Sequence, residues 1–233
     1  MISRRWFLTL AGMAWVMRPD SQLWAREAVP AELDHILLGV SDLESGIAWV
    51  EQRTGVRAAV GGVHPGRGTR NALLSLGSRH YLEIIAPDPQ QPGIGMYDRL
   101  SAMKEPRLFD WAVHTNDIDA AAKRAVAAGF AIDGPRDGSR ARPDGKTLHW
   151  KSFNLKDDRG GLLPFFIEWG RESVHPSEDA PKGCTLKRFW LELPAEGELA
   201  KECKNLGVEV AVERAKQARL RAVIATPKGD IEL

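Results

Sequence analysis

The sequence predicts an α+β fold in which two βαβββ modules form a curled-sheet cup and a third, partial module follows. Two observations lead to this prediction. The order of one strand, one helix and three strands occurs three times along the chain. The helix-capping pairs Asp42-Leu43 and Asp117-Ile118 also lie at matching places, 75 residues apart. Each copy alone would expose an apolar sheet face, so the copies are expected to pack against one another.

The first module is predicted at 32–86. It begins with a short apolar strand at 33–40, and Asp42 then provides the N-cap of a helix at 43–54. Gly55 ends this helix, because glycine adopts left-handed conformations without steric cost. The pattern after the helix predicts three strands, at 57–60, 71–76 and 80–86.

The second module is predicted at 108–170 and repeats this order. Asp117 is the N-cap of an alanine-rich helix at 118–128, which ends at Gly129. One strand is expected before this helix and three after it, at 108–115, 130–133, 147–155 and 162–169. The two modules together form one predicted domain at 32–170.

A third and shorter module is predicted at 184–233. Its helix is expected at 196–205, and its strands at 186–193, 208–213, 220–226 and 230–233. Three segments rich in proline, glycine and charge are expected to be loops and linkers, at 87–106, 134–146 and 171–182.

The N-terminal segment is interpreted as an export signal. Arg4 and Arg5 precede Trp6-Phe7-Leu8 and an apolar run that ends near Met17, which resembles a bacterial twin-arginine signal peptide at 1–25. Such a signal is read by the twin-arginine export machinery and predicts a periplasmic or otherwise exported protein. The run is too short for an ordinary membrane span, so no stable span is expected after cleavage. An N-terminal helix of the mature fold and an uncleaved anchor are the alternatives.

The overall charge and the cysteine content narrow the classes of partner. The chain has 32 basic and 31 acidic residues, a net charge of +1, so no nucleic-acid partner is expected. Cys184 and Cys203 are too few for a disulfide scaffold or a four-thiolate zinc site. Two buried free thiols are expected, and a disulfide between them, which an oxidising compartment would permit, is the alternative. The expected partner is a small-molecule ligand.

Four phrases in the chain carry a resemblance to a known family: Leu33-Asp34-His35, the segment 64–71, the segment 81–85 and the segment 164–169. With the βαβββ order, they resemble the vicinal oxygen chelate superfamily, which includes glyoxalase I, bleomycin-resistance proteins and extradiol dioxygenases. More narrowly, they resemble the glyoxalase-like domain family. The superfamily contains lyases, isomerases, dioxygenases and non-catalytic binders, so the resemblance implies the fold and leaves the reaction open.

The resemblance implies a metal site on the first and last strands of each module. Transferred residue by residue, it implies the ligands His35, Glu83, Asp110 and Glu168. One imidazole and three carboxylates would suit a divalent ion such as Mg²⁺, Mn²⁺, Ni²⁺ or Zn²⁺. The second histidine of the iron-dependent oxygenase triad is missing, which disfavours extradiol cleavage. Asp110 also has a shorter reach than the usual ligand, so an incomplete or empty site is the alternative.

Three residues are candidates for acid–base chemistry. Glu83 and Glu168 are lone carboxylates in apolar strands, where each needs a metal, a histidine or an arginine as partner. His114 follows Asp110 by four residues, so strand alternation predicts the same face for both. His114 would be either a pocket acid–base or a core histidine.

A glycine-rich segment before a strand supplies the candidate substrate-binding residues, His64, Arg67, Thr69, Arg70 and Asn71. In one interpretation the segment overhangs the cup and offers hydrogen-bond donors to a carboxylate or carbonyl group. In the other it is a hairpin loop with solvated arginines.

Three functions follow from these patterns. The first is an exported lyase or isomerase in which a divalent metal polarises a carbonyl group while Glu83 or Glu168 moves a proton. The alternative is a metal-free binding or sequestration protein of the bleomycin-resistance type. The third uses the free face of the last module for a homodimer or for docking a partner.

Overall fold

The structure, a computed structural model, describes residues 29–142, 145–195 and 197–233. Its strands are β1 (Leu33–Gly39), β2 (Ala59–His64), β3 (Thr69–Ser75), β4 (Tyr81–Pro87), β5 (Arg107–His114), β6 (Ile132–Ala141), β7 (Thr147–Leu155), β8 (Phe165–Trp169), β9 (Thr185–Leu193), β10 (Ala211–Arg214), β11 (Arg219–Thr226) and β12 (Gly229–Glu232). Its helices are α2 (Leu43–Thr54), α3 (Tyr97–Ser101), α4 (Ile118–Ala127), α5 (Pro176–Asp179) and α6 (Glu198–Asn205).

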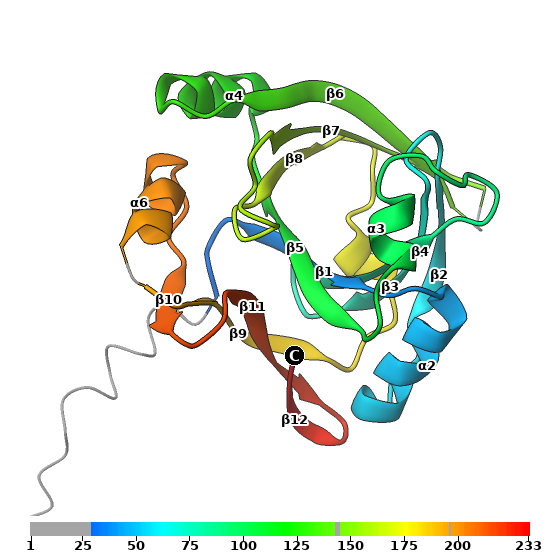
Figure 1. Cartoon of the computed structure of the whole chain (residues 1–233). Coiled ribbons are helices and arrows are strands. Elements are labelled where there is room, and N and C mark those ends of the chain that lie inside the picture. The colour runs from blue at the N-terminus through cyan, green and yellow to red at the C-terminus, as the bar shows by residue number, and fades with distance from the viewer. Residues whose placement is uncertain (1–28, 143–144, 196) are drawn as a thin grey trace, which may run out of the picture.

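The first two modules share one sheet, with the strand order β2-β3-β4-β1-β5-β8-β7-β6. Its centre is the antiparallel pair β1 and β5, and each of these strands also pairs in parallel with the last strand of its own module. Figure 1 shows this sheet curled into a ring, in which the edge strands β2 and β6 approach each other. At the closure a Cβ on Gly62 would lie 2.7 Å from the carbonyl oxygen of Ala141. The predicted repeat and the curled α+β fold are confirmed.

The predicted helix caps are also confirmed. The side chain of Asp42 accepts a hydrogen bond from the backbone N–H of Ser45, and Asp117 does the same for Ala120. Gly55 ends α2 with a φ of 79°, a conformation that a residue with a Cβ avoids. α2 and α4 cover the outer face of the sheet, where residues such as Ile47 join the main hydrophobic core.

Part of a predicted loop is a strand. The segment 134–146 is rich in glycine and proline, yet β6 extends to Ala141 and pairs with β7 over its length. β6 is an edge strand, where Pro135 can lack a backbone N–H without breaking a ladder on both sides. Pairing with β7 satisfies its other backbone groups, which the sequence pattern alone did not show.

Two short helices lie in segments that were also expected to be loops. α3 packs Leu100, together with Met103 just after the helix, onto Leu37, Ile85 and Phe109 of the sheet's inner face. Figure 1 shows α3 within the opening of the ring. α5 follows β8 and contacts β3. These two segments therefore cover parts of the inner face.

The third module has the predicted order of elements in a different sheet arrangement. In the first two modules the first strand pairs with the last, whereas β9 lies between β10 and β11 in the order β10-β9-β11-β12. Phe189 of β9 packs against Trp111 of β5, with ring centroids 5.0 Å apart. The third module thus extends the core on the outer face of the curled sheet.

Both cysteines, Cys184 and Cys203, are buried and free, as expected. No helix in the described part of the chain is long and apolar enough to cross a membrane. The predicted signal at 1–25 lies outside the described residues.

Candidate functional site

Strand alternation determines which side chains reach the inner face of the curled sheet. On β4, Leu82 and Ile84 join the core under the helices, whereas Ile85 packs with the inner-face residue Leu37. Glu83 therefore points inward from β4, and His35 points inward from the neighbouring strand β1. The sheet brings these two predicted residues into contact.

His35 lies between two carboxylates. Its Nδ1 is 2.7 Å from Oδ1 of Asp34, and its Nε2 is 3.3 Å from Oε2 of Glu83. All three side chains are buried. The ring of Tyr81 stacks on the imidazole, with centroids 4.3 Å apart. The imidazole is held in one orientation by these contacts, with one nitrogen facing each acid.

The contacts shift the pKa values of this pair in opposite directions. Burial by itself would lower the pKa of His35, but the hydrogen bonds to Asp34 and Glu83 raise it to about 9. Burial by itself would raise the pKa of Glu83, but the hydrogen bond from His35 and the nearby positive charge lower it to about 2. At neutral pH the pair is therefore an imidazolium and a carboxylate.

A second group of polar side chains extends from Glu83 toward the hairpin of β2 and β3. Asn71 Nδ2 donates to Oε1 of Glu83 over 2.7 Å and also lies 3.2 Å from Nε2 of His64. His64 Nδ1 is 2.8 Å from the hydroxyl of Thr69. Burial lowers the pKa of His64 to about 4, so this imidazole is neutral at neutral pH.

On the other side, Asp34 links the site to the segment before α5. Its Oδ2 accepts a hydrogen bond from Nε1 of Trp169 at 3.0 Å and lies 3.2 Å from Nε2 of His175. The Nδ1 of His175 is 2.8 Å from the hydroxyl of Ser177. A continuous chain of polar contacts therefore runs from Ser177 through Asp34, His35 and Glu83 to the β2–β3 hairpin.

Arg140 is a buried cation beside this chain. It extends from β6, at the other edge of the sheet, and its charge acts on Glu83, Tyr81 and His64. Burial lowers the pKa of Arg140, although a guanidinium keeps its charge at neutral pH. The two carboxylates, Asp34 and Glu83, are thus balanced by the cations His35 and Arg140. The sequence did not indicate Arg140 because its segment was predicted to be a loop.

Asp110 lies on the inner face of β5, opposite Leu37 of β1. Its Oδ1 accepts a hydrogen bond from the backbone N–H of Trp111 at 2.8 Å. Burial, with a smaller contribution from the charge of Asp158, raises the pKa of Asp110 to about 7. Within the described residues, Asp110 makes no hydrogen bond or ion pair with Glu83 or His35.

Glu168 points away from the inner face. Its Oε2 accepts a hydrogen bond from the backbone N–H of Ile118, at the start of α4 on the outer face, over 2.8 Å. The neighbouring residue Phe165, by contrast, packs against His35 with its ring edge. The structure therefore corrects the expectation that Glu168 lies beside Glu83. In the strand pairing, Phe165 lies opposite Ala112 as Glu83 lies opposite Leu37, so the residue that matches Glu83 is Phe165, three positions before Glu168. A displacement by an odd number of residues moves a side chain to the opposite face.

The structure does not bring the four predicted metal ligands together. Glu83 and His35 are in contact, and Asp110 lies on β5 without a hydrogen bond to either of them. Glu168 accepts a hydrogen bond from the backbone N–H of Ile118 on the outer face. In the described part of the chain, no group of three or more His, Cys, Asp or Glu side chains is placed to hold a metal ion. These donors do not fit the predicted divalent ion.

The other predicted residues divide between the inner face and the surface. His64, Thr69 and Asn71 are buried within the polar chain, whereas Arg67 is exposed on the turn. Nη2 of Arg70 lies 3.9 Å from Oδ2 of Asp42, the N-cap residue of α2. His114 lines a separate pocket of about 310 Å³ that also contains Arg124 and Leu206–Val208, and none of the polar-chain residues.

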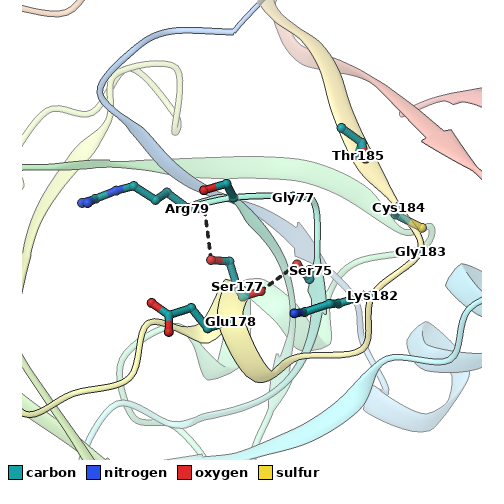
Figure 2. A pocket seen from close by; sticks show the side chains of 10 residues that line it. Ser75, Gly77, Arg79, Ser177, Glu178, Lys182, Gly183, Cys184 and Thr185 are labelled. Carbon is teal, nitrogen blue, oxygen red and sulfur yellow. Dashed lines mark hydrogen bonds between the residues drawn. The ribbon is translucent and has the colours of Figure 1, made fainter.

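A larger pocket lies beside one end of the polar chain. It has a volume of about 700 Å³ and lies between the β3–β4 turn, α5 and the start of β9. Figure 2 shows Ser177 on its wall, with its carbonyl oxygen bonded to the Ser75 hydroxyl and its own hydroxyl bonded to the Arg79 N–H. Asp34, His35 and Glu83 do not line this pocket.

Two curled modules joined through their first strands, with a polar cluster inside, define a protein of the vicinal oxygen chelate fold. The chain belongs to the glyoxalase-like domain family, whose model matches residues 33–207. Curated protein sequences give no match to this chain.

Several solved structures are similar to this chain. A hypothetical protein from Staphylococcus aureus is 14% identical, with a TM-score of 0.62 over 80% of this chain and 87% of that chain. Methylmalonyl-CoA epimerase from Mycobacterium tuberculosis is 23% identical, with a TM-score of 0.47 over 64% of this chain and 93% of that chain. The Streptomyces coelicolor epimerase in complex with 2-nitronate-propionyl-CoA is 20% identical, with a TM-score of 0.46 over 63% and 99%. Of these likenesses, the one to the Staphylococcus aureus protein shows the fold and nothing beyond it.

Proposed function

We propose that the inner face of the curled sheet binds a small molecule with a carbonyl or carboxylate group, and that Glu83 and His35 transfer a proton at the adjacent carbon. The observation that carries this proposal is the buried contact of 3.3 Å between Nε2 of His35 and Oε2 of Glu83. General acid–base catalysis requires a base and an acid that are positioned within hydrogen-bond reach of the reacting atoms. The reaction class is that of an isomerase or a lyase.

Each member of the pair has a distinct role in this reaction. Glu83 is ionised and can accept a proton from carbon, while His35 is protonated and can donate to a developing oxygen anion. Asp34 orients the imidazole from its other nitrogen. A ligand that reaches the pair must pass the cover formed by α3, because Leu100 and Met103 pack on the inner face.

The proposed reaction takes no step through a metal ion, because the donors do not fit one. In this it departs from the metal-dependent lyase or isomerase that the sequence suggested. The charge of the buried carboxylates is instead balanced by His35 and Arg140.

Proton exchange with solvent tests the proposal before any product is identified. The full chain is incubated in D₂O with a panel of small 2-oxo acids, 2-hydroxy acids and acyl thioesters, and loss of the α-proton is followed by ¹H NMR. At least one compound should exchange, at a rate that a metal chelator leaves unchanged. Glu83→Gln should reduce this rate about 100-fold or more, whereas the control Glu168→Gln should not. Exchange by no compound, or exchange that needs a metal, would contradict the proposal.

A second function is supported by the aromatic side of the inner face. Phe165 meets His35 edge-on with centroids 5.5 Å apart, and Trp150 and Trp169 lie 5.8 Å apart. Aromatic side chains suit an apolar or aromatic ligand. We therefore keep metal-free binding or sequestration as the alternative. It predicts saturable binding of an aromatic compound, for example by quenching of tryptophan fluorescence, with no proton exchange.

We also infer that residues 1–25 direct export through the twin-arginine pathway. The support is the sequence alone, with Arg4 and Arg5 followed by Trp6-Phe7-Leu8. Residues 1–30 fused to a reporter should be exported, and the pair of substitutions Arg4→Lys and Arg5→Lys should abolish export. Continued export of the double variant would contradict the inference.

A further inference from the structure

Arg140 is a buried guanidinium that makes no direct contact with an acidic group of the described residues. The side chain is only 4% exposed. Among the described residues, its guanidinium makes no hydrogen bond and no ion pair. The guanidinium lies against β2, where a Cβ on Gly61 would come within 2.6 Å of Nη1. The donors of this guanidinium are therefore unused, and a ligand that carries acceptor oxygens could bind them.

Asn71 provides a second unfilled group at the same place. Its Nδ2 donates to Glu83, and because Glu83 is ionised this fixes which end of the amide is the oxygen. The Oδ1 is buried and has no hydrogen-bond partner among the described residues. It is close to Arg140, since both would crowd the same Cβ on Gly61. The two residues thus offer a charged donor fork and an unused acceptor side by side.

We infer that Arg140 and Asn71 form a subsite for a small carboxylate that carries a hydroxyl group on the adjacent carbon. The guanidinium fork would bind the carboxylate through two hydrogen bonds. The hydroxyl would donate to Oδ1 of Asn71. A 2-hydroxy acid supplies both groups at the required spacing, whereas a simple carboxylate leaves Oδ1 unfilled and a 2-oxo acid presents a second acceptor to it.

The subsite also places the ligand relative to the proposed acid–base pair. Asn71 bonds Glu83 with one amide atom and would bond the ligand with the other, so the carbon bearing the hydroxyl would lie beside Glu83. This deepens the proposed function by naming its substrate class, and it rests on that function for the proton transfer. The binding itself depends on Arg140 and Asn71 alone.

The test uses binding of three probes to the full chain, measured by calorimetry: lactate, propionate and pyruvate. Lactate should bind, and propionate and pyruvate should each bind about tenfold or more weakly. Arg140→Gln should weaken lactate binding about 100-fold, and Arg140→Lys, which keeps the charge without the fork, about tenfold. Arg136→Gln is the matched control, because Arg136 is exposed on the same strand and pairs with Asp133.

The outcomes separate the subsite from the proposed function. Equal binding of lactate and propionate to the unmodified chain would overturn the subsite. This comparison needs no variant, so it does not depend on whether a variant folds. Lactate binding that survives in Arg140→Gln, with folding checked by thermal unfolding, would also overturn it. Lactate binding that depends on Arg140 without proton exchange would support the subsite and contradict the acid–base role of Glu83. Proton exchange on a compound whose binding does not depend on Arg140 would contradict the subsite and support the acid–base role of Glu83.

Discussion

The two modules of the curled sheet present different chemistry on one inner face, although their strands pair by the same plan. On β4 of the first module, Glu83 is a buried carboxylate bonded to His35 and Asn71. On β8 of the second, alternation places Phe165 and Trp169 inward and Glu168 outward. The difference shows that the two modules share the same pairing of backbone strands, while the side chains on each face of the sheet differ between them.

The largest effect should come from removing the charge of the first module's inner carboxylate. Glu83→Gln leaves His35 and Arg140 buried with only Asp34 to balance them. We expect the free energy of unfolding to fall by about 3–5 kcal/mol, measured by urea denaturation at pH 7. An unchanged or higher stability would show that the modules do not differ in the way the structure indicates.

The pH dependence of stability should reveal the His35 ion pair. The folded pKa of His35 is raised to about 9 from 6.5, so its contribution is fully present below pH 6.5 and is lost as the pH rises through 9. The shift corresponds to roughly 3 kcal/mol. Urea denaturation from pH 6 to 10 should show this decline in the unmodified chain and not in His35→Gln. An imidazole NMR titration centred near pH 6.5 would contradict the pairing.

Asp110 should behave in the opposite way to Glu83. Its folded pKa is raised from 3.8 to about 7, so the folded state holds the proton longer and stability should fall as the pH rises from about 4 to 7. Asp110→Asn removes this ionisation and should stabilise the protein at pH 8 by about 1–3 kcal/mol, reduced by solvent screening of the half-buried carboxyl. Thermal unfolding at pH 5 and pH 8 gives the comparison. A destabilised variant at pH 8 would indicate a partner for the ionised form.

The smallest effect should come from Glu168, the residue that the sequence had matched to Glu83. In Glu168→Gln the amide oxygen can still accept the hydrogen bond from Ile118 N–H, and only the charge at the start of α4 is lost. We expect a loss of about 0.3–1 kcal/mol in urea denaturation. A loss similar to that of Glu83→Gln would mean that Glu168 reaches the inner face.

Many of the helix boundaries were predictable because they depend on residues that are close together in the sequence. Asp42 and Asp117 cap the helices where the spacing predicted, and Gly55 ends the first helix in the left-handed conformation. β6 was not predictable in the same way. Its glycines and proline are typical of a loop, and only pairing with β7 makes the segment a strand.

The site was predictable only where two residues lie in one module. His35 and Glu83 are in contact because β1 and β4 pair in parallel. The resemblance to the superfamily had implied that these two residues share a site. Asn71, His64 and Thr69 join them because the β2–β3 hairpin directs all three inward. The prediction for Glu168 was wrong because successive residues on a strand face opposite sides, and the alignment was displaced by three positions, an odd number.

The sequence by itself determined the α+β class, the repeat and the helix caps, because short-range periodicity and capping do not depend on distant contacts. It indicated the pair His35 and Glu83 only through the family resemblance. Only the tertiary structure decided that Arg140 stands beside Glu83. They lie 57 positions apart in the chain, and the curl of the sheet brings β6, which carries Arg140, to the β2–β3 hairpin, whose Asn71 donates to Glu83. The charge balance of the interior depends on the approach of β2 and β6, and no short-range sequence pattern predicts that approach.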